Sequence, residues 1–207
     1  MPSAFSHAVA AAGLAACFYH PGVPKRVWVL GALCAALPDL DVIGFRFGIR
    51  YGDLLGHRGL THSLPAAAVL AALVAAAFPR GTPGLGRGAL WLFFFLATAS
   101  HGLLDACTDG GLGVALFSPF SNQRFFFPFR PIRVAPIGLG RFFSARGLAV
   151  LKSELLWVWL PAALLAAAAL AVRVPTPSGG RPSAAPIRGG GRGRPDPPPT
   201  APTPMGG

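Results

Sequence analysis

Long hydrophobic segments with almost no charge constrain the fold of this chain more than any other feature. Four such windows are Ala4–Tyr19, Leu60–Phe78, Ala89–Cys107 and Leu155–Val172. The last three approach the ~20 apolar residues that a membrane-spanning helix requires. A fifth window, Val27–Gly44, is interrupted by Pro38 and two aspartates. Only 12% of the residues are charged, whereas soluble domains carry ~25%. The pattern predicts an all-α integral membrane bundle of about four or five helices and argues against a soluble helical protein.

The C-terminal part of the chain differs in composition from the hydrophobic part. Residues 173–207 are rich in Pro, Gly and Arg and contain no aromatic residue. Such a segment cannot bury enough apolar surface to fold. We therefore expect a membrane-embedded domain of residues 1–172 followed by a disordered tail. The stretch "RGGGRGR" (Arg188–Arg194) could bind RNA or anionic lipid. A solvated basic tail, with no specific nucleic-acid partner, is the simpler interpretation.

Histidines and acidic residues are scarce, and most of them fall at the ends of the hydrophobic segments. In an up-and-down bundle these ends alternate, so the chain direction can be traced from one segment to the next. The residues that this tracing brings to one end are His7, Asp39, Asp41, His57, His62, His101, Asp105 and Glu154. The other end receives His20 and the loop Pro79–Arg87, which contains no His or acid. Ionisable groups near a membrane are costly and usually functional, so we predict a functional site at the first end.

The residue types and their spacing favour a metal site. His101 and Asp105 are four residues apart and share one face of a helix. His57 and His62 flank a helix start that Thr61 or Ser63 could cap. Each residue alone has an ordinary structural explanation, such as a local hydrogen bond, but their convergence does not. Imidazoles and carboxylates together suit Zn²⁺, Mn²⁺ or Fe²⁺. All eight residues are therefore candidate ligands for one or two divalent ions, with His62 the firmest and His57 either a ligand or a substrate contact.

The connection Leu116–Arg133, "LFSPFSNQRFFFPFRPIR", lies at the same end and is rich in Phe and Arg. We expect its phenylalanines to rest in the membrane interface, in contact with lipids. Asn122, Arg124 and Arg130 could contact an anionic substrate, as Arg often does with phosphate. The alternative is that the loop arginines bind lipid headgroups and only position the protein. Arginines are more numerous in the loops of this end, which favours a cytoplasmic site, although the basic tail leaves from the other end and nearly cancels the bias.

Five stretches of the sequence carry a family resemblance. They are "SHAVAAAG" (Ser6–Gly13), "ALPDLD" (ending at Asp41), "HRGLTHS" (His57–Ser63), "HGLLDACTDGG" (His101–Gly111) and "FSPFSNQRF" (Phe117–Phe125). Over roughly residues 3–172 the chain resembles the bacterial membrane-bound metal-dependent hydrolases, the YdjM-like inner-membrane proteins. The resemblance implies a multi-pass protein of the bacterial inner membrane with hydrolase activity.

A more distant similarity is to zinc-dependent phospholipase C and the P1-type nucleases, which are all-helical. Carried over by motif, that similarity implies metal-binding roles for His7, Asp39, His62, His101, Asp105 and Glu154. Those enzymes also use an N-terminal Trp, whereas this chain begins Met1-Pro2, and the residue four before Glu154 is Val150 rather than His. We therefore expect one or two ions rather than three, with Asp41 and His57 filling vacancies.

These observations lead to a functional hypothesis. The chain would hydrolyse a phosphoester or lipid-linked substrate with a metal-activated water. Asp39 would be the general base, and Arg58 or Arg124 would offset charge that develops on the phosphate. One alternative is a non-enzymatic metal-binding membrane protein, either a transporter or a scaffold. Transport sites usually lie near the membrane midplane, whereas these candidates lie at helix ends. Another alternative is a lipid- or partner-binding protein that uses the aromatic loop and the tail.

Overall fold

The structure is a computed structural model, and it describes residues 2–78, 80–135 and 144–173. Its elements are α1 (Ala4–Cys17), α2 (Lys25–Ala36), the 3₁₀ segments η1 (Leu37–Phe47) and η2 (Leu60–His62), α3 (Leu64–Ala76), α4 (Arg87–Ala106), α6 (Ala145–Glu154), the π-helical segment η3 (Leu155–Trp159) and α7 (Leu160–Ala171). Because η1 continues α2 and η3 joins α6 to α7, the described residues form five helices besides the short η2. Outside the helices these residues form only isolated β-bridges. The predicted all-α fold is confirmed.

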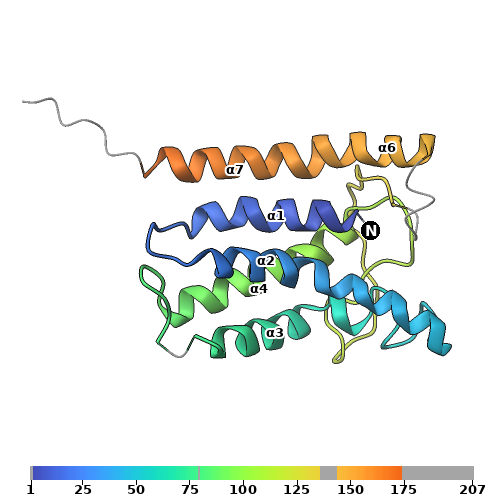
Figure 1. The fold of residues 1–207 in the computed structure, drawn as a ribbon. Coiled ribbons are helices and arrows are strands. Elements are labelled where there is room, and N and C mark those ends of the chain that lie inside the picture. The colour runs from blue at the N-terminus through green and yellow to red at the C-terminus, as the bar shows by residue number, and fades with distance from the viewer. Residues whose placement is uncertain (1, 79, 136–143, 174–207) are drawn as a thin grey trace, which may run out of the picture. The chain divides into compact units, whose positions relative to one another are not determined.

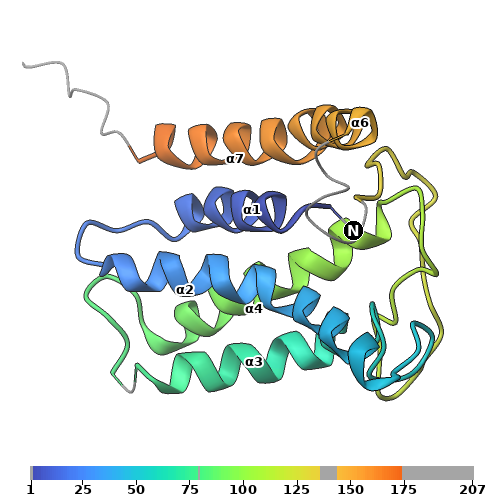
Figure 2. The same cartoon turned by 45° about the vertical axis from the view of Figure 1, so that its right-hand side comes forward.

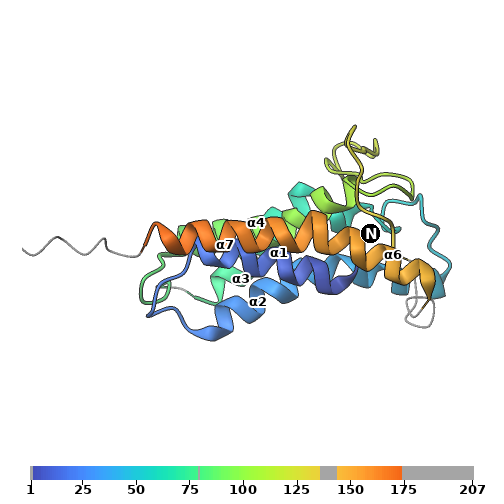
Figure 3. The ribbon, with the colours of Figure 1, turned by 90° about the horizontal axis from the view of Figure 1, so that it is seen from above.

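The helices lie side by side in one bundle (Figure 1). α1 packs against α2, α4 and α7, and α4 also packs against α2 and α3. Short connections join the helices at one end, whereas long irregular segments lie at the other end, where α1 begins (Figure 2). We call this second end the polar end; it contains the start of α1, η1, η2, the end of α4, and α6. Seen from above in Figure 3, the long helix of α6 and α7 lies over α1.

Three helices are long and apolar enough to cross a membrane: Lys25–Phe47, Arg87–Ala106 and Ala145–Ala171. One of the sequence predictions needs correction here. The window Leu60–Phe78 contains a helix of only 13 residues, because Ser63 caps it and Pro65 lies in its first turn. The window Val27–Gly44, for which the sequence left open whether it spans the membrane, lies within the helix Lys25–Phe47. Pro38 lies in the first turn of η1, where the helix changes from α to 3₁₀ geometry.

Apolar packing changes in character along the bundle. Far from the polar end, Leu90, Phe93 and Phe94 of α4 are fully buried in the main core. Towards the polar end, Ala11 of α1 and Ala35 at the end of α2 meet Ala97 of α4. Because alanine side chains are small, they let these three helices approach closely one turn before the candidate site.

Residue 173 is the only part of the predicted tail, 173–207, that lies within the described residues. Arg173 donates hydrogen bonds to the carbonyl oxygens of Ala16, Cys17 and Tyr19. A cation in this position satisfies free carbonyl groups at the end of α1 and interacts favourably with the helix dipole. The contact fixes the end of α7 against the end of α1.

Candidate metal centre

Four buried side chains from three elements form a compact group at the polar end. Asp39 comes from η1, His62 from η2, and His101 and Asp105 from α4, with one donor atom of each lying within 4.8 Å of the others. His62 Nε2 lies 3.0 Å from His101 Nε2, and Asp39 Oδ1 lies 3.3 Å from His101 Nε2. Asp105 Oδ2 lies 3.5 Å from His62 Nε2. Donors bound ~2.0 Å from a tetrahedral zinc are about 3.3 Å apart, so these spacings fit a single ion.

The hydrogen bonds of the two imidazoles determine which nitrogen faces the group. His101 Nδ1 lies 2.6 Å from the carbonyl oxygen of Ala35, which can only accept, so Nδ1 is the donor. His62 Nδ1 lies 3.0 Å from the hydroxyl oxygen of Thr61 and 3.2 Å from Asp41 Oδ2. Because the Thr61 hydroxyl gives its proton to Asp41, both neighbours of this nitrogen are acceptors, and Nδ1 is again the donor. In the neutral rings, the lone pairs of both Nε2 atoms therefore point into the group. Two lone pairs 3.0 Å apart repel each other unless a proton or a metal ion lies between them.

Glycine residues allow η2 to approach α4 this closely. A Cβ atom on Gly102 would lie 2.4 Å from the carbonyl oxygen of His62. A Cβ atom on Gly59 would lie 2.4 Å from the carbonyl oxygen of Leu54. Both distances are too short for any side chain. Gly102 of "HGLLDACTDGG" therefore permits the close approach of η2 to α4, and Gly59 of "HRGLTHS" permits the tight packing of the loop that precedes η2.

Asp41 organises the histidines rather than joining the first group. Its Oδ1 lies 2.7 Å from His57 Nδ1, and its Oδ2 accepts a 2.7 Å hydrogen bond from the Thr61 hydroxyl besides the contact with His62. Asp41, His57 and His62 form a second group that could hold a metal ion. A neutral imidazole has a single lone pair, however, so His62 cannot serve both groups as a ligand. Carboxylates that orient a ligating histidine in this way are common around metal sites.

Replacement of Asp41 with asparagine should lower metal affinity by about 10–100-fold, the loss that follows removal of a carboxylate that orients a ligand. Asparagine has the size of aspartate but lacks the charge and one of the two acceptor oxygens. Affinity would be measured by competition with a chromogenic chelator. Asp53→Asn is the matched control, because Asp53 pairs with the exposed Arg50 outside the site. Equal affinities for the two variants would contradict the orienting role.

His7 extends the group from α1. Its ring stacks on the ring of His101 with centroids 3.6 Å apart, and its Nε2 lies 3.8 Å from Asp105 Oδ1. In the part of the chain that the structure describes, neither ring nitrogen of His7 and neither carboxylate oxygen of Asp39 has a partner with hydrogen-bond geometry. Buried polar atoms nearly always have a hydrogen-bond partner. Buried nitrogen and oxygen atoms without such a partner are what a cation-binding site would offer as ligands.

Among the described residues, Arg58 heads the large side chains that are fully buried, and its guanidinium pairs with Asp105. Its Nε lies 3.0 Å from Asp105 Oδ2, and its two terminal nitrogens donate to the Gly110 carbonyl and the Thr108 hydroxyl. Its backbone has φ 62°, a left-handed conformation that costs a residue with a side chain about 1 kcal/mol or more. The nitrogen atoms of the Arg58 guanidinium thus contact groups of the protein itself. Its contact with a substrate stays a prediction.

Arg124 also binds protein groups. It donates to the carbonyl oxygens of His57 and Tyr51, each at 3.1 Å, and lies over the Tyr51 ring. These contacts tie the aromatic connection to the loop that carries His57. Elsewhere in that connection, Phe120 is 86% exposed, and the expected contact of its phenylalanines with lipid stays a prediction.

The structure does not bring Glu154 into either group. Its carboxylate accepts hydrogen bonds from the backbone N–H and hydroxyl of Ser3 and from the hydroxyl of Ser6. Trp159 donates its indole N–H to the same Ser6 oxygen. In an α-helix, residues five apart point about 140° away from each other, but the π-helical turn η3 places them on one face. The contacts position the first turn of α1, and a ligand role for Glu154 stays a prediction.

At the opposite end of the bundle, His20 makes local contacts and belongs to neither of the two groups that could hold a metal ion. His20 accepts a hydrogen bond from the backbone N–H of Gly22 and packs beside Gly84 of the facing connection. The contributors to the polar end that were not predicted include Thr61, the carbonyl oxygen of Ala35, and Ser6. Thr61 and Ser6 lie inside the quoted motifs, next to a histidine, and this adjacency was the available signal. A backbone carbonyl carries no signal in the sequence.

The first group also affects protonation of His62. Burial lowers the pKa of His62, but the carboxylates of Asp39, Asp41 and Asp105 outweigh this effect and raise the pKa from 6.5 to about 9. In the metal-free protein, a proton on His62 can therefore occupy the space between the two Nε2 atoms. Its contribution to stability is fully present below pH 6.5 and is lost as the pH rises through about 9.

Metal binding should follow the opposite trend with pH. A cation must displace the proton of His62, so affinity should rise by about tenfold per pH unit towards pH 9. Chelator competition at several pH values between 7 and 9 would measure the slope. An affinity that does not change over this range would show that His62 carries no proton that competes with the metal.

The fold and this site define a helical membrane protein with a buried His/Asp cluster that could hold a metal ion at one end of the bundle. The chain belongs to the YdjM inner membrane protein family, whose sequence model matches residues 1–176. It is similar to the inner membrane protein YbcI of Escherichia coli K12, with 41% identity over 165 residues that cover 80% of this chain and 95% of the relative. The protein is thus an inner membrane protein, as predicted. No solved structure matches the chain significantly.

Proposed function

We propose that this protein is a metal-dependent hydrolase in which Asp39, His62, His101 and Asp105 hold one divalent cation. The observation that carries the proposal is the pair of Nε2 atoms 3.0 Å apart, each on a ring whose Nδ1 faces an acceptor. Two imidazoles and two carboxylates suit Zn²⁺ best, with Mn²⁺ and Fe²⁺ as alternatives. One ion is expected rather than two, because His62 has a single lone pair to offer.

The chemistry that such an ion supplies is activation of water at neutral pH and polarisation of a phosphoryl oxygen. The protein residues divide the remaining tasks. Asp39 is the most accessible member of the group, at 8% exposure, and is the candidate proton acceptor. Arg58 fixes the Asp105 carboxylate, and Asp41 fixes the His62 ring. The expected substrate is a phosphoester of a membrane lipid or of a lipid-linked molecule, because the site lies at the end of membrane-spanning helices.

The test uses the full chain in mild detergent after expression with ample metal. Elemental analysis should find about one ion per chain. Hydrolysis of bis(p-nitrophenyl) phosphate and of phospholipids should be lost with chelator and restored by added Zn²⁺ or Mn²⁺. Absence of bound metal would refute the proposal. Bound metal without hydrolysis of any phosphoester would refute the enzymatic part and support a transporter or scaffold.

A further inference from the structure

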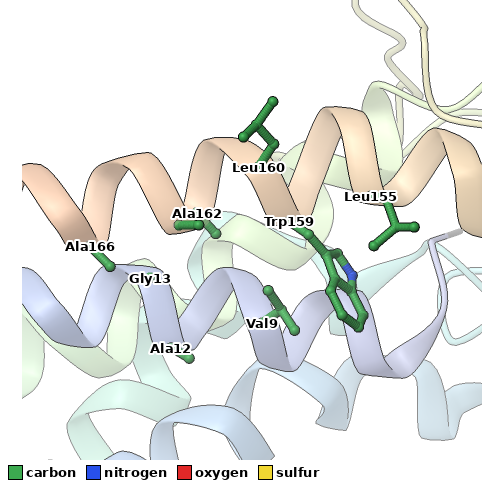
Figure 4. Close-up of a pocket in the computed structure, with 9 residues that line it drawn as sticks. Val9, Ala12, Gly13, Leu155, Trp159, Leu160, Ala162 and Ala166 are labelled. Carbon is green, nitrogen blue, oxygen red and sulfur yellow. The ribbon is translucent and has the colours of Figure 1, made fainter.

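Hollows of two kinds lie on the surface of the bundle. The hollow between α1 and the η3–α7 helix is lined by apolar side chains such as Val9 and Leu160 (Figure 4). The indole N–H of Trp159, which also lines it, is already donated to Ser6, so the described lining selects no ligand. The second kind is a pocket of about 360 Å³ at the polar end, between the end of α4, the connection that follows it, and α6. Charged side chains line this pocket, and they indicate the chemistry of a ligand.

Two arginines and one aspartate line the polar pocket. Arg133 belongs to the connection, Arg146 to the first turn of α6, and Asp109 follows the end of α4. Asp109 Oδ1 accepts a 2.8 Å hydrogen bond from the backbone N–H of Val134. Both arginines are exposed, and within the described part of the chain neither guanidinium has an ion pair or a hydrogen-bond partner. The pocket therefore has an excess of positive charge and two free guanidinium groups.

Hydrogen bonds fix the backbone around the pocket. The backbone N–H of Asp109 donates to the Ile132 carbonyl oxygen at 2.9 Å. The backbone N–H of Arg133 donates to the Ser153 hydroxyl at 3.0 Å, which donates to the Val150 carbonyl oxygen of α6 at 2.7 Å. The connection is thus tied to the end of α4 on one side and to α6 on the other. A preformed backbone reduces the ordering that a ligand must impose when it binds.

The position of Arg146 is unfavourable unless an anion lies nearby. Ser144 is the N-cap of α6 and accepts a hydrogen bond from the backbone N–H of Gly147. The first turn of α6 contains no acidic residue. The positive end of a helix dipole disfavours a cation and favours an anion. An anion between Arg146 and Arg133 would remove this repulsion and neutralise the excess charge of the pocket.

The pocket lies at the level of lipid headgroups. The candidate span Ala145–Ala171 has 27 residues, or ~40 Å of helix, which exceeds the ~30 Å hydrocarbon core of a bilayer. The excess belongs to the α6 end, because α6 carries Arg146, Lys152 and Ser153 whereas α7 is apolar. An arginine at this level can reach the phosphate of a lipid headgroup and also phosphate dissolved in the adjoining water.

The pocket lies next to the candidate metal centre but is separate from it. Arg58 pairs with Asp105 of the centre and donates to the Thr108 hydroxyl and the Gly110 carbonyl. A Cβ atom on Gly110 would lie 2.8 Å from Cγ1 of Val134, so the wall of the pocket packs against residues that hold Arg58. None of the four residues that could hold one ion lines the pocket.

We propose that the pocket lined by Arg133 and Arg146 binds a phosphate group. Guanidinium groups hold phosphate through charge-assisted and frequently bidentate hydrogen bonds. The phosphate can belong to a lipid headgroup or be free in solution, and the pocket recognises the group that both share. The site goes beyond the proposed hydrolase function and does not depend on it.

Equilibrium dialysis with radiolabelled inorganic phosphate tests the pocket. The full chain is kept in a neutral detergent after removal of metal with chelator, so that phosphate cannot bind to a metal ion. We expect saturable binding with a dissociation constant on the order of 1 mM. The double substitution Arg133→Gln and Arg146→Gln should weaken binding by at least about tenfold, because both charged donors are lost.

The matched control removes the same charge from the same end of the bundle. Arg46 lies in η1, and Arg130 lies over the Phe126 ring; neither lines the pocket. The double substitution Arg46→Gln and Arg130→Gln should bind phosphate within about twofold of wild type, because distant exposed charges are screened. Absence of saturable binding to wild type, or equal losses in the two double variants, would overturn the proposal.

Asp109→Asn provides a test of the opposite sign. Asparagine keeps the oxygen that accepts from Val134 but removes the negative charge. Phosphate should then bind about two- to fivefold more tightly, since repulsion between like charges is relieved. Damage to the fold cannot produce tighter binding, so this variant also guards against misfolding of the double variants. Unchanged or weaker binding would contradict the role of charge in the pocket.

Native mass spectrometry distinguishes the two sources of phosphate. The protein is released from micelles that contain equal amounts of phosphatidic acid and phosphatidylcholine. Preferred retention of phosphatidic acid by wild type and by the control, but not by the variant with both pocket arginines replaced, would assign the site to a lipid headgroup. Equal retention of both lipids by all three proteins, with phosphate binding intact, would assign it to free phosphate.

Metal content, measured in parallel on protein that has not met chelator, separates this proposal from the hydrolase. It should be equal in wild type and in both double variants, because the pocket supplies no ligand to the metal centre. Absence of metal with phosphate binding intact would refute the hydrolase alone. Bound metal without phosphate binding would refute the pocket alone.

Discussion

Replacement of His62 with alanine should reduce metal affinity by more than about 100-fold, beyond the ~10–100-fold loss that follows changes around the ligands. His62 belongs to both groups that could hold an ion, and its Nε2 faces His101, Asp39 and Asp105 at once. Alanine removes this donor and leaves space for water. The loss should also remove any chelator-sensitive hydrolysis.

Elemental analysis after gel filtration would measure the bound metal, and chelator competition would measure the affinity. His20→Ala is the control, since His20 lies at the opposite end of the bundle beside Gly22 and Gly84. That variant should keep its metal in full. A His62→Ala protein that retains wild-type metal content would show that the ion, if present, lies elsewhere.

Replacement of Arg58 with methionine should lower the free energy of unfolding of the metal-free protein by about 3–5 kcal/mol, the cost of leaving one member of a buried ion pair alone. Arg58 and Asp105 are both fully buried, so water cannot replace the lost guanidinium. Methionine retains most of the side-chain volume, and the left-handed backbone at this position is equally unfavourable for both residues. Bound metal should reduce the loss, because a cation also neutralises Asp105.

Unfolding by increasing SDS in mixed micelles, followed by circular dichroism, would measure this effect with and without Zn²⁺. The same substitution in an Asp105→Asn background provides the control, because the carboxylate charge is then absent. The destabilisation should be clearly smaller in that background. An equal loss in both backgrounds would assign the effect to packing or to the contacts of Arg58 with Thr108 and Gly110 rather than to the ion pair.

Several features of the site follow from helical periodicity and from the alternating direction of consecutive helices, both of which can be derived from the sequence. His101 and Asp105 lie on one face of α4 because four residues make about one helical turn, and in the structure they approach to 4.0 Å. The gathering of His7, Asp39 and His62 at the same end follows from the alternating direction of consecutive helices. Both arguments need only the positions of the hydrophobic segments.

Other features depend on which atoms face each other across the bundle. From the sequence, Asp39 and Asp41 are equivalent candidates, because they are only two residues apart in the same motif. In the structure, Asp41 contacts His57 and His62, whereas Asp39 faces the His62–His101 pair. The roles of Arg58 and Arg124 also depend on loop packing, because a long charged side chain can reach partners from many elements. Helical periodicity cannot predict such contacts.

The sequence by itself determined an all-helical membrane protein whose histidines and acids collect at one end, because hydrophobic length and chain direction are properties of local segments. Only the tertiary structure decided that Pro38 continues a helix, that the π-helical turn points Glu154 and Trp159 at Ser6, and that two imidazoles face each other at 3.0 Å. These outcomes depend on the close approach of segments distant in the chain. Glycines such as Gly102 permit that approach, but the sequence does not show which neighbour fills the space.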